Sequence, residues 1–534
     1  MSRTHRSLPV RLLLLSVLVV AVAPGSARAA EYVVGSGSYP TLASVPWSSL
    51  GPGDIVTIPH RAEPYRETFA VTTSGTAQAP ILVRGTRGPG DARPVIDGEN
   101  AVQGANTHVR ALLSLRNGAS NVIVEGLEFR NAHIDYAHDG LFPGHNASGI
   151  YVEDASHVVI RDCELHGNGN GLFSAPGTVD LRVERNYLWG NGNVGRAFEH
   201  NSYTETDGIV FEGNRYGPLC SGCPGNNLKD RSAGTVIRYN FIEGGNRALD
   251  LVHAESDDAD FTQRVATTPT YVYGNVFIKT DDTTQSQVVH FGGDDGSVPN
   301  NYRRALRFYN NTVYSTRAVR TTFFHCDAPA PDVDIRNSVF VTPSSSQIYL
   351  LDSSSSTGAT VALVNSYLPP TWDVSVEVAL DAAVTTTGVT TGTTPGFVNG
   401  PAFDFHLLPS AAVRDGGAAL LGGVPALLRE YVTHQDTRAR DEDGPLDLGA
   451  FEVCESGCAP VVPPDGGVIP GGDSAVPPLA DGGRGADGGT EPGAGGGCGC
   501  RVQRAPHTRP GALALLFLLT LIPVARAARR RPRT

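Results

Sequence analysis

Lys229 and Arg231 are the residues of this sequence whose types and spacing most directly suggest chemistry. The chain has 42 lysine and arginine residues, and only Lys229 and Lys279 are lysines. A lysine amine can serve as a general base where its surroundings favour the neutral form, whereas arginine keeps its charge. Arg231 follows Lys229 by two residues, so both side chains lie on one face if the segment is a strand.

A base beside a fixed cation suits one class of reaction. The base removes a proton next to a carboxylate, and the cation stabilises the enolate-like intermediate. Three more polar residues lie on neighbouring segments and could line the same face in a fold built of successive coils. The predicted catalytic set is therefore Lys229 as base and Arg231 as stabilising group, with His200, Asp250 and His253 beside them.

Two other interpretations of these residues stay open. A glycoside hydrolase needs two carboxylates at a set separation, which Asp207, Asp230 and Asp250 could supply. Alternatively, Lys229 and its charged neighbours are solvated surface groups, and His200 has only a structural role.

The segments that must position these residues repeat along the chain. Each alternates apolar and polar residues, as a half-buried strand does, and each is interrupted at a polar position that is often Asn. The segments are NVIVEGLEF from Asn121, HVVIRDCEL from His157, DLRVERNYL from Asp180, TVIRYNFI from Thr235, YVYGNVFI from Tyr271, LRFYNNTVY from Leu306 and VDIRNSVF from Val333.

The interruptions align at intervals between 23 residues (Cys163 to Asn186) and 36 residues (Leu127 to Cys163). Such a period, with loops inserted in some units, is typical of a solenoid. Asn tolerates left-handed backbone angles, and stacked Asn side chains can bond to one another. The aligned positions are Leu127, Cys163, Asn186, Asn214, Asn240, Asn275, Asn311, Asn337 and Asn365.

The repeats predict an all-β fold, a right-handed parallel β-helix, because parallel crossovers are right-handed. A β-sandwich would not place Asn at the same point of successive units. Residues 31–100 are predicted to form the N-terminal cap and first coils, and residues 401–452 the closing coils, since open ends expose strand edges. Residues 31–453 resemble the secreted right-handed β-helix repeat proteins of the pectate-lyase-like superfamily.

Two narrower resemblances cover the region around Lys229. The motifs HNSY from His200, NNLKDR from Asn226 and LDL from Leu249, with HFGGDDG from His290, are similar to a large set of uncharacterised bacterial β-helix proteins. Lys229 also matches the catalytic lysine of the chondroitinase B and alginate lyase family. That resemblance implies that Lys229 takes the C5 proton of a uronate.

The lyase resemblance has two departures. The family places its catalytic arginine just before a histidine, whereas Val252 precedes His253 here. The family holds calcium with acidic residues shortly before the lysine, whereas residues 220–227 contain none. The cofactor stays unknown: Asp281-Asp282 and Asp294-Asp295 are oxygen-rich loop segments that could bind calcium, and the alternative is that these acidic turns are only solvated.

The N-terminal 30 residues are predicted to be a secretory signal peptide. Three arginines precede an apolar run from Leu12 to Ala23, and Ala27-Arg28-Ala29 is a small-residue cleavage site. The alternative is an uncleaved anchor. In either case residues 31–453 work outside the cytoplasm.

The C-terminus combines a Gly/Pro/Asp-rich linker, residues 454–497, with a tail, residues 498–534. The tail has Cys498 and Cys500, a short apolar run that predicts a transmembrane helix, and an arginine cluster. It resembles the MYXO-CTERM sorting tail. The resemblance implies processing by a myxosortase-type enzyme near Cys498 or Cys500; the alternative is an ordinary anchor. We expect an exported protein, held at the cell surface or outer membrane or secreted after processing.

Export makes disulfides plausible. Cys220 and Cys223 are predicted to pair, with a metal or redox site as the alternative, and Cys454 is predicted to pair with Cys458. Cys163 and Cys326 are predicted to be small core residues.

The net charge of the chain limits which partners it can bind. Without the 12 arginines of the two ends, the formal net charge of −12 becomes about −24, which excludes general binding to nucleic acid. The same charge would repel an anionic polysaccharide unless a local basic site or a metal ion offsets it. On the residues around Lys229 we predict a monomeric cell-surface protein that binds an acidic polysaccharide, with its cleavage by β-elimination as a further hypothesis. The alternative class is a non-catalytic adhesin or structural β-helix module.

Overall fold

The computed structural model describes residues 29–453, except 136–139, 144, 282–284, 295–300, 343–346, 353–357, 376–381 and 442–443. The chain divides into two units, Met1–Gly471 and Gly472–Thr534, and every described residue belongs to the first. The predicted signal peptide, linker, sorting cysteines and apolar tail run thus lie outside the described residues, apart from Ala29 and Ala30.

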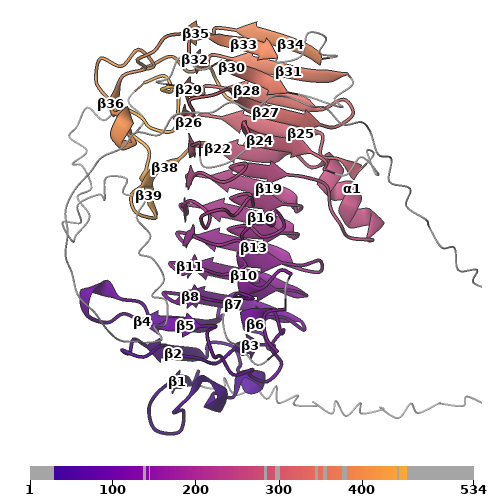
Figure 1. Ribbon diagram of the computed structural model, residues 1–534, viewed down its shortest axis with the longest axis vertical. Helices are drawn as coiled ribbons and strands as arrows, with labels where there is room; N and C mark the ends of the chain where they lie inside the picture. Colours follow the sequence, from indigo (N-terminus) through magenta and orange to yellow (C-terminus); the bar gives the residue numbers. More distant parts are fainter. Residues whose placement is uncertain are drawn as a thin grey trace, which may run out of the picture. The chain divides into compact units, whose positions relative to one another are not determined.

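The described chain winds through three parallel sheets, one strand of each per coil, and the coils stack as a right-handed β-helix (Figure 1). This confirms the predicted all-β fold class. The first sheet has 13 strands: β1 (Glu31–Val33), β2 (Ile55–Pro59), β4 (Ile81–Thr86), β7 (Ala119–Glu125), β10 (Ala155–Arg161), β13 (Val179–Glu184), β16 (Asp207–Glu212), β19 (Ala233–Arg238), β22 (Thr270–Tyr273), β25 (Ala305–Tyr309), β28 (Asp332–Arg336), β31 (Ala359–Val364) and β34 (Ala382–Thr387).

The second and third sheets have 11 strands each. The second sheet contains β5 (Val95–Asp97), β8 (Glu128–Arg130), β11 (Glu164–His166), β14 (Tyr187–Trp189), β17 (Arg215–Tyr216), β20 (Phe241–Glu243), β23 (Val276–Lys279), β26 (Thr312–Ser315), β29 (Val339–Val341), β32 (Tyr367–Leu368) and β35 (Thr390–Thr391). The third sheet contains β3 (Phe69–Val71), β6 (Ala111–Leu115), β9 (Ser148–Val152), β12 (Asn170–Ser174), β15 (Ser202–Thr204), β18 (Leu228–Asp230), β21 (Leu249–Leu251), β24 (Gln287–Gly292), β27 (Thr321–Asp327), β30 (Ile348–Asp352) and β33 (Trp372–Ser375).

Alternation along each strand builds the core. In β10, Val158 and Ile160 are buried and pair in register with Leu181 and Val183 of β13, so like positions stack from coil to coil. The helix α1 (Ala259–Thr267) is inserted between β21 and β22. Its Phe261 packs on the outside of the first sheet against Ala233.

The predicted asparagine stack exists at the corner between the first and second sheets. The side-chain oxygen of Asn240 accepts a hydrogen bond from the backbone N–H of Asn214 at 2.9 Å. The side-chain oxygen of Asn275 accepts one from the backbone N–H of Asn240, also at 2.9 Å. The stack runs from Asn186 to Asn311, and each of these side chains is fully buried. Its amides satisfy backbone N–H groups that the turn leaves without a sheet partner.

Two details of the predicted stack were wrong. Ser338 and Ser366 continue it, through Asn311 N–H to Ser338 Oγ at 3.2 Å and Ser338 N–H to Ser366 Oγ at 3.3 Å. Asn337 and Asn365 lie one residue earlier, with φ of 51° and 41°. The left-handed position therefore precedes the stacked residue, because the chain turns there before the amide enters the core.

The two ends are closed differently. After β1, the 3-10 helices η1 (Leu42–Ser44) and η2 (Trp47–Ser49) place Leu42 and Trp47 against the core, as expected of a cap. Residues 401–452, expected as closing coils, form no further coil in the described chain.

This C-terminal segment packs sideways. It contains the antiparallel pairs β36 (Phe397–Asn399) with β37 (Asp404–Leu407) and β38 (Arg429–Val432) with β39 (Asp436–Ala439), beside η5 (Gly400–Ala402). Its apolar residues pack on outward-facing side chains of the second sheet, beside which the hairpins lie in Figure 1. A further parallel coil was the wrong expectation. The outward apolar face of the second sheet extends along several coils, and the C-terminal segment covers that face instead of adding a coil.

Cysteine positions agree with the sequence where they are described. Cys220 and Cys223 form a disulfide, with Cα atoms 5.3 Å apart. Cys163 and Cys326 are buried in the core. Cys454 and Cys458 lie outside the described residues. No helix in the described ranges is both long and apolar enough to cross a membrane.

Replacing Asn240 by Ala tests the stack. The change removes the acceptor of the buried Asn214 N–H, and we expect the free energy of unfolding to fall by about 2–4 kcal/mol. Guanidinium denaturation followed by circular dichroism measures this. The control is Gln263→Ala on α1, where the amide is exposed, and the expected change is within about 0.5 kcal/mol. Equal effects of the two substitutions would contradict the proposed stabilising role.

Candidate functional site

One column of outward-facing side chains on the third sheet carries the site. Parallel register places Tyr203 beside Lys229, Lys229 beside Asp250, and Asp250 beside His290. The flanking residues Leu228, Leu249 and Leu251 point into the core, and this inward packing directs the polar side chains outward. The fold thus brings segments tens of residues apart within ion-pair distance.

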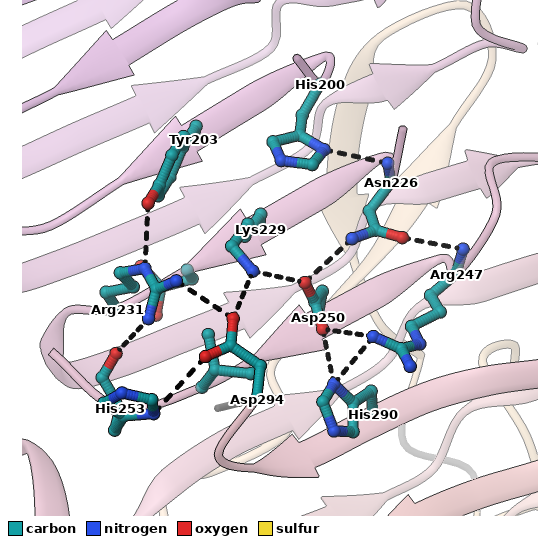
Figure 2. A network of polar contacts seen from close by, with 12 residues as sticks. His200, Tyr203, Asn226, Lys229, Arg231, Arg247, Asp250, His253, His290 and Asp294 are labelled. Carbon is teal, nitrogen blue, oxygen red and sulfur yellow. Dashed lines mark hydrogen bonds and ion pairs between the residues drawn. The ribbon is translucent and has the colours of Figure 1, made fainter. Parts of the chain in front are cut away.

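Lys229 and Arg231 converge on one carboxylate, that of Asp294 (Figure 2). Asp294 Oδ2 accepts from Lys229 Nζ at 2.8 Å and from Arg231 Nη2 at 2.9 Å. Its other oxygen lies 3.6 Å from His253 Nδ1. Burial raises the pKa of Asp294, but the charges of Lys229 and Arg231 outweigh it and hold that pKa below its usual value.

Asp250 is the fixed anion at the centre of the network. One of its oxygens accepts from Lys229 Nζ and Asn226 Nδ2, each at 2.8 Å, and the other from Arg247 Nη1 at 3.1 Å and His290 Nδ1 at 2.6 Å. Burial raises its pKa, yet the Lys229 charge and the His290 bond hold it well below its usual range. All four acceptor positions of this carboxylate are used, so Asp250 orients its neighbours rather than taking a proton.

Arg231 is buried, with only 4% of its side chain exposed. Its guanidinium also donates to Tyr203 Oη at 2.9 Å and to the His253 carbonyl at 2.6 Å. The His253 ring stacks on Tyr302 with centroids 5.0 Å apart. Arg231 is therefore held rigidly, as a group that stabilises developing charge must be.

His200 belongs to the same network, and it is connected to Asp250 through Asn226. Its Nδ1 accepts from the backbone N–H of Asn226 at 2.8 Å, and the Asn226 amide holds Asp250. Burial, together with the charge of Lys229, lowers the pKa of His200 to about 3. His200 is thus a neutral positioning residue at neutral pH.

The structure brings all five sequence-predicted residues into one network. It contradicts solvated charges at Lys229 and a shared site for the three carboxylates, while a structural role of His200 agrees with it. Lys229, Arg231 and Asp230 are 9%, 4% and 0% exposed, so they are not solvated surface charges. Asp230 points inward and pairs with buried Arg303 at 2.7 Å. Asp207 lies on the first sheet and pairs with Arg264 of α1. The three carboxylates suggested for a hydrolase therefore do not share a site.

Sequence reasoning missed the partners that complete the site. Asp294 was expected only as a calcium loop residue, because nothing in its motif revealed two buried cations opposite it. His290 was noticed only within the HFGGDDG motif. Glu205 was not singled out, although burial raises its pKa to about 7, and it accepts from the backbone N–H groups of Glu255 and Ser256 at 3.0 and 2.8 Å.

Calcium does not fit this site. A calcium ion takes six to eight oxygen ligands, whereas the described carboxylates around Lys229 are occupied by cationic side chains. The segment before Lys229, where the lyase family holds calcium, contains the Cys220–Cys223 disulfide and no acidic residue.

Comparisons with known proteins agree on the fold. The family described as "Right handed beta helix region" matches residues 114–262. No curated protein gives a significant sequence match.

Solved structures give only distant matches. An alginate lyase from Paenibacillus sp. str. FPU-7 is 14% identical with a TM-score of 0.36, covering 64% of this chain and 93% of its own. Pectate lyase Pel9A is 15% identical with a TM-score of 0.39, covering 80% and 96%. The GH136 lacto-N-biosidase from Eubacterium ramulus is 13% identical with a TM-score of 0.35, covering 68% of each chain. Matches this distant carry no argument about activity.

The burial of His200 predicts a pH dependence of stability. An unfolded histidine has a pKa near 6.5, whereas the pKa of folded His200 is about 3. Between these two pH values the unfolded chain binds a proton at this residue and the folded chain does not. Stability is therefore highest above pH 6.5 and falls on acidification, by up to about 1.4 kcal/mol per pH unit from this group.

Denaturation at pH 7 and pH 4.5 checks this, because His200→Gln should lose less stability on acidification than the parent protein. His157 is exposed and serves as the control. A His200→Gln slope equal to that of the parent would show that this imidazole does not carry the effect.

Proposed function

We propose that the Lys229 face of the third sheet binds an acidic polysaccharide and cleaves it by β-elimination, with Lys229 as the base. The observation that carries the proposal is the shared carboxylate. Lys229 Nζ and Arg231 Nη2 lie 2.8 and 2.9 Å from one oxygen of Asp294. Two buried cations that hold a protein carboxylate form a site that suits a uronate carboxylate in its place.

Aromatic side chains continue the same column beside the cations. Tyr151 stacks on Phe173 with centroids 5.3 Å apart, and Phe173 packs edge-on against Tyr203 at 5.1 Å. Phe173 and Tyr203 are partly exposed. Their apolar faces supply the surface on which a sugar ring packs through its C–H groups.

In the proposed mechanism each group has a role. A substrate carboxylate that replaces Asp294 on Arg231 leaves Lys229 with the Asp250 ion pair alone. The uncharged Lys229 amine then takes the C5 proton, and Arg231 stabilises the enolate-like intermediate. The C4–O bond breaks next, a C4–C5 double bond forms, and the departing oxygen takes a proton from water. Glu205, whose pKa burial raises to about 7, is a carboxyl group that can hold a proton near neutral pH.

One observation favours the second candidate, a non-catalytic binding module. Lys229 donates to two carboxylates at 2.8 Å, and abstraction of a proton requires its uncharged form. If both ion pairs persist with the sugar bound, the face binds polysaccharide without cleaving it, as an adhesin does.

The place of action forms part of the proposal. The signal-like N-terminus and the tail around Cys498 and Cys500 support export and display at the cell surface, with the tail removed by a myxosortase-type enzyme. Degradation of the chain when intact cells are treated with a protease tests this location.

The Lys229→Met variant tests cleavage. Met keeps the length of the side chain but removes the amine, so we expect the rate on alginate, pectate or chondroitin to fall by about 10²- to 10⁴-fold. The ultraviolet absorbance of the unsaturated product measures the rate. Arg182→Met, on the first sheet with 41% of its side chain exposed, is the control. An unchanged rate in Lys229→Met, or no product from the parent protein on any uronate polymer, would reject β-elimination by Lys229.

The Asp294→Asn variant tests binding. It should strengthen the interaction with the polymer, whereas Lys229→Met should lower the rate of cleavage. Removal of the internal carboxylate takes one anion from each cation, while Lys229 keeps Asp250 and Arg231 keeps Glu255. We expect the uronate polymer to bind about tenfold more tightly, from loss of a competing charge-assisted bond. Calorimetric titration with the polymer measures this. Asp332→Asn breaks a comparable pair with Arg307 on the first sheet and should leave affinity unchanged. Weaker binding by Asp294→Asn would mean that this carboxylate belongs to the binding surface itself.

A further inference from the structure

His290, His325 and Asp327 form a cluster that the proposed function does not use. β24 and β27 pair in parallel, with His290 beside His325 and Gly292 beside Asp327. One ring nitrogen of each histidine and one Asp327 oxygen lie within 4.8 Å of one another. Three potential ligand atoms at these separations can coordinate a single metal ion.

The His290 ring is held in a defined orientation from behind. Its Nδ1 lies 2.6 Å from Asp250 Oδ1, and only 2% of the side chain is exposed. Arg247 Nη1 lies 2.9 Å from the same ring nitrogen and donates to Asp250 Oδ1 at 3.1 Å. The short contact with the ionised Asp250 favours the ring proton on Nδ1 and the lone pair on Nε2, and Arg247 then bonds to Asp250 rather than to the ring.

That Nε2 atom points at the cluster without a hydrogen-bond partner. It is buried, and it lies 3.4 Å from Asp327 Oδ2, beyond hydrogen-bonding geometry. Buried polar atoms in native proteins nearly always have a partner. An ion between His290 Nε2 and the Asp327 carboxylate gives this ring nitrogen the partner that it lacks.

His325 has a looser version of this arrangement one coil further, with a longer contact at its Nδ1. Its Nε2 lies 2.8 Å from Asp327 Oδ2, and its Nδ1 lies 3.7 Å from Asp352 Oδ1. Each imidazole thus has a carboxylate behind it and the Asp327 carboxylate in front. Metal-binding histidines are commonly oriented by a carboxylate on the far ring nitrogen.

The donor set selects the class of ion. Imidazole nitrogen suits zinc, copper, nickel and iron, whereas calcium and magnesium require oxygen ligands. The side chains of His325 and Asp327 are 12% and 18% exposed, so one side of the cluster faces solvent. Three protein ligands with an open side are the arrangement of zinc sites that accept a water or substrate oxygen.

We propose that His290, His325 and Asp327 bind a divalent transition-metal ion of the zinc class, with one coordination position open to an oxygen ligand. This site is separate from the carboxylate-binding pair, and its existence does not depend on the proposed function. Asp250 joins the two, because it contacts both Lys229 Nζ and His290 Nδ1. A sugar hydroxyl or carboxylate lying along the column could therefore reach the open position.

The test is metal binding by the purified full-length chain after removal of metal with a chelator. Cys498 and Cys500 are replaced by Ser throughout, so that tail thiolates contribute no binding. Titration calorimetry with Zn²⁺, and the visible absorption of Co²⁺, should report one equivalent per chain. Excess Ca²⁺ or Mg²⁺ should not compete.

Matched variants assign the ion to the cluster. His325→Ala and Asp327→Asn should abolish the stoichiometric binding, and Asp352→Asn should weaken it by about 10- to 100-fold. His157→Ala, at an exposed histidine beside Asp180 on the first sheet, should change nothing. Circular dichroism confirms that each variant is folded. The proposal is overturned if the folded parent binds neither Zn²⁺ nor Co²⁺ with one-to-one stoichiometry, or if His325→Ala and Asp327→Asn bind as the parent does.

Discussion

The parallel register between successive coils is the constraint on which the rest of this structure depends. Every residue of a strand lies beside its counterpart in the next coil, about 4.7–4.9 Å away. A side chain must therefore be compatible with one above and one below it. Inside the helix this rule yields the amide stack from Asn186 to Asn311. Outside, it yields a column in which Lys229, Asp250 and His290 follow one another, with the Asp250 carboxylate between the amine and the imidazole.

Register also explains how so many charges are buried. Lys229, Arg231 and Asp250 are each almost fully withdrawn from water, which is costly unless every charge is paired and hydrogen-bonded. The column meets that requirement, since Asp250 accepts four bonds and Asp294 joins two cations. Such a network is rigid because no member can move without leaving another unpaired. Rigidity of this kind is what separates a built site from scattered surface charge.

The sequence predicted the fold, the stacked amides and the grouping of Lys229 with Arg231, because each follows from local alternation and a repeated period. It did not predict Asp294 opposite the two cations, nor the pairing of His290 with His325, since both depend on loop lengths between coils. The same limit applies to Ser338, which takes the place of Asn in the stack. The lateral packing of residues 397–453 was missed for another reason. A short amphipathic segment fits a further coil or an existing apolar face equally well, and only the completed helix shows which face is open.

The C-terminal hairpins change how the solenoid can come apart. A stack of coils that touch only their neighbours tends to unzip from its ends, one coil after another. Here Gln435 bonds to the carbonyl of Arg185, Leu428 to Tyr239, and Ala450 to Thr312, so one segment spans several coils. The last coils can unfold only after this C-terminal segment has separated from the coils that it spans. End fraying is thereby coupled to the middle of the helix, where the charged column lies, and the coils beneath it should open together rather than in sequence.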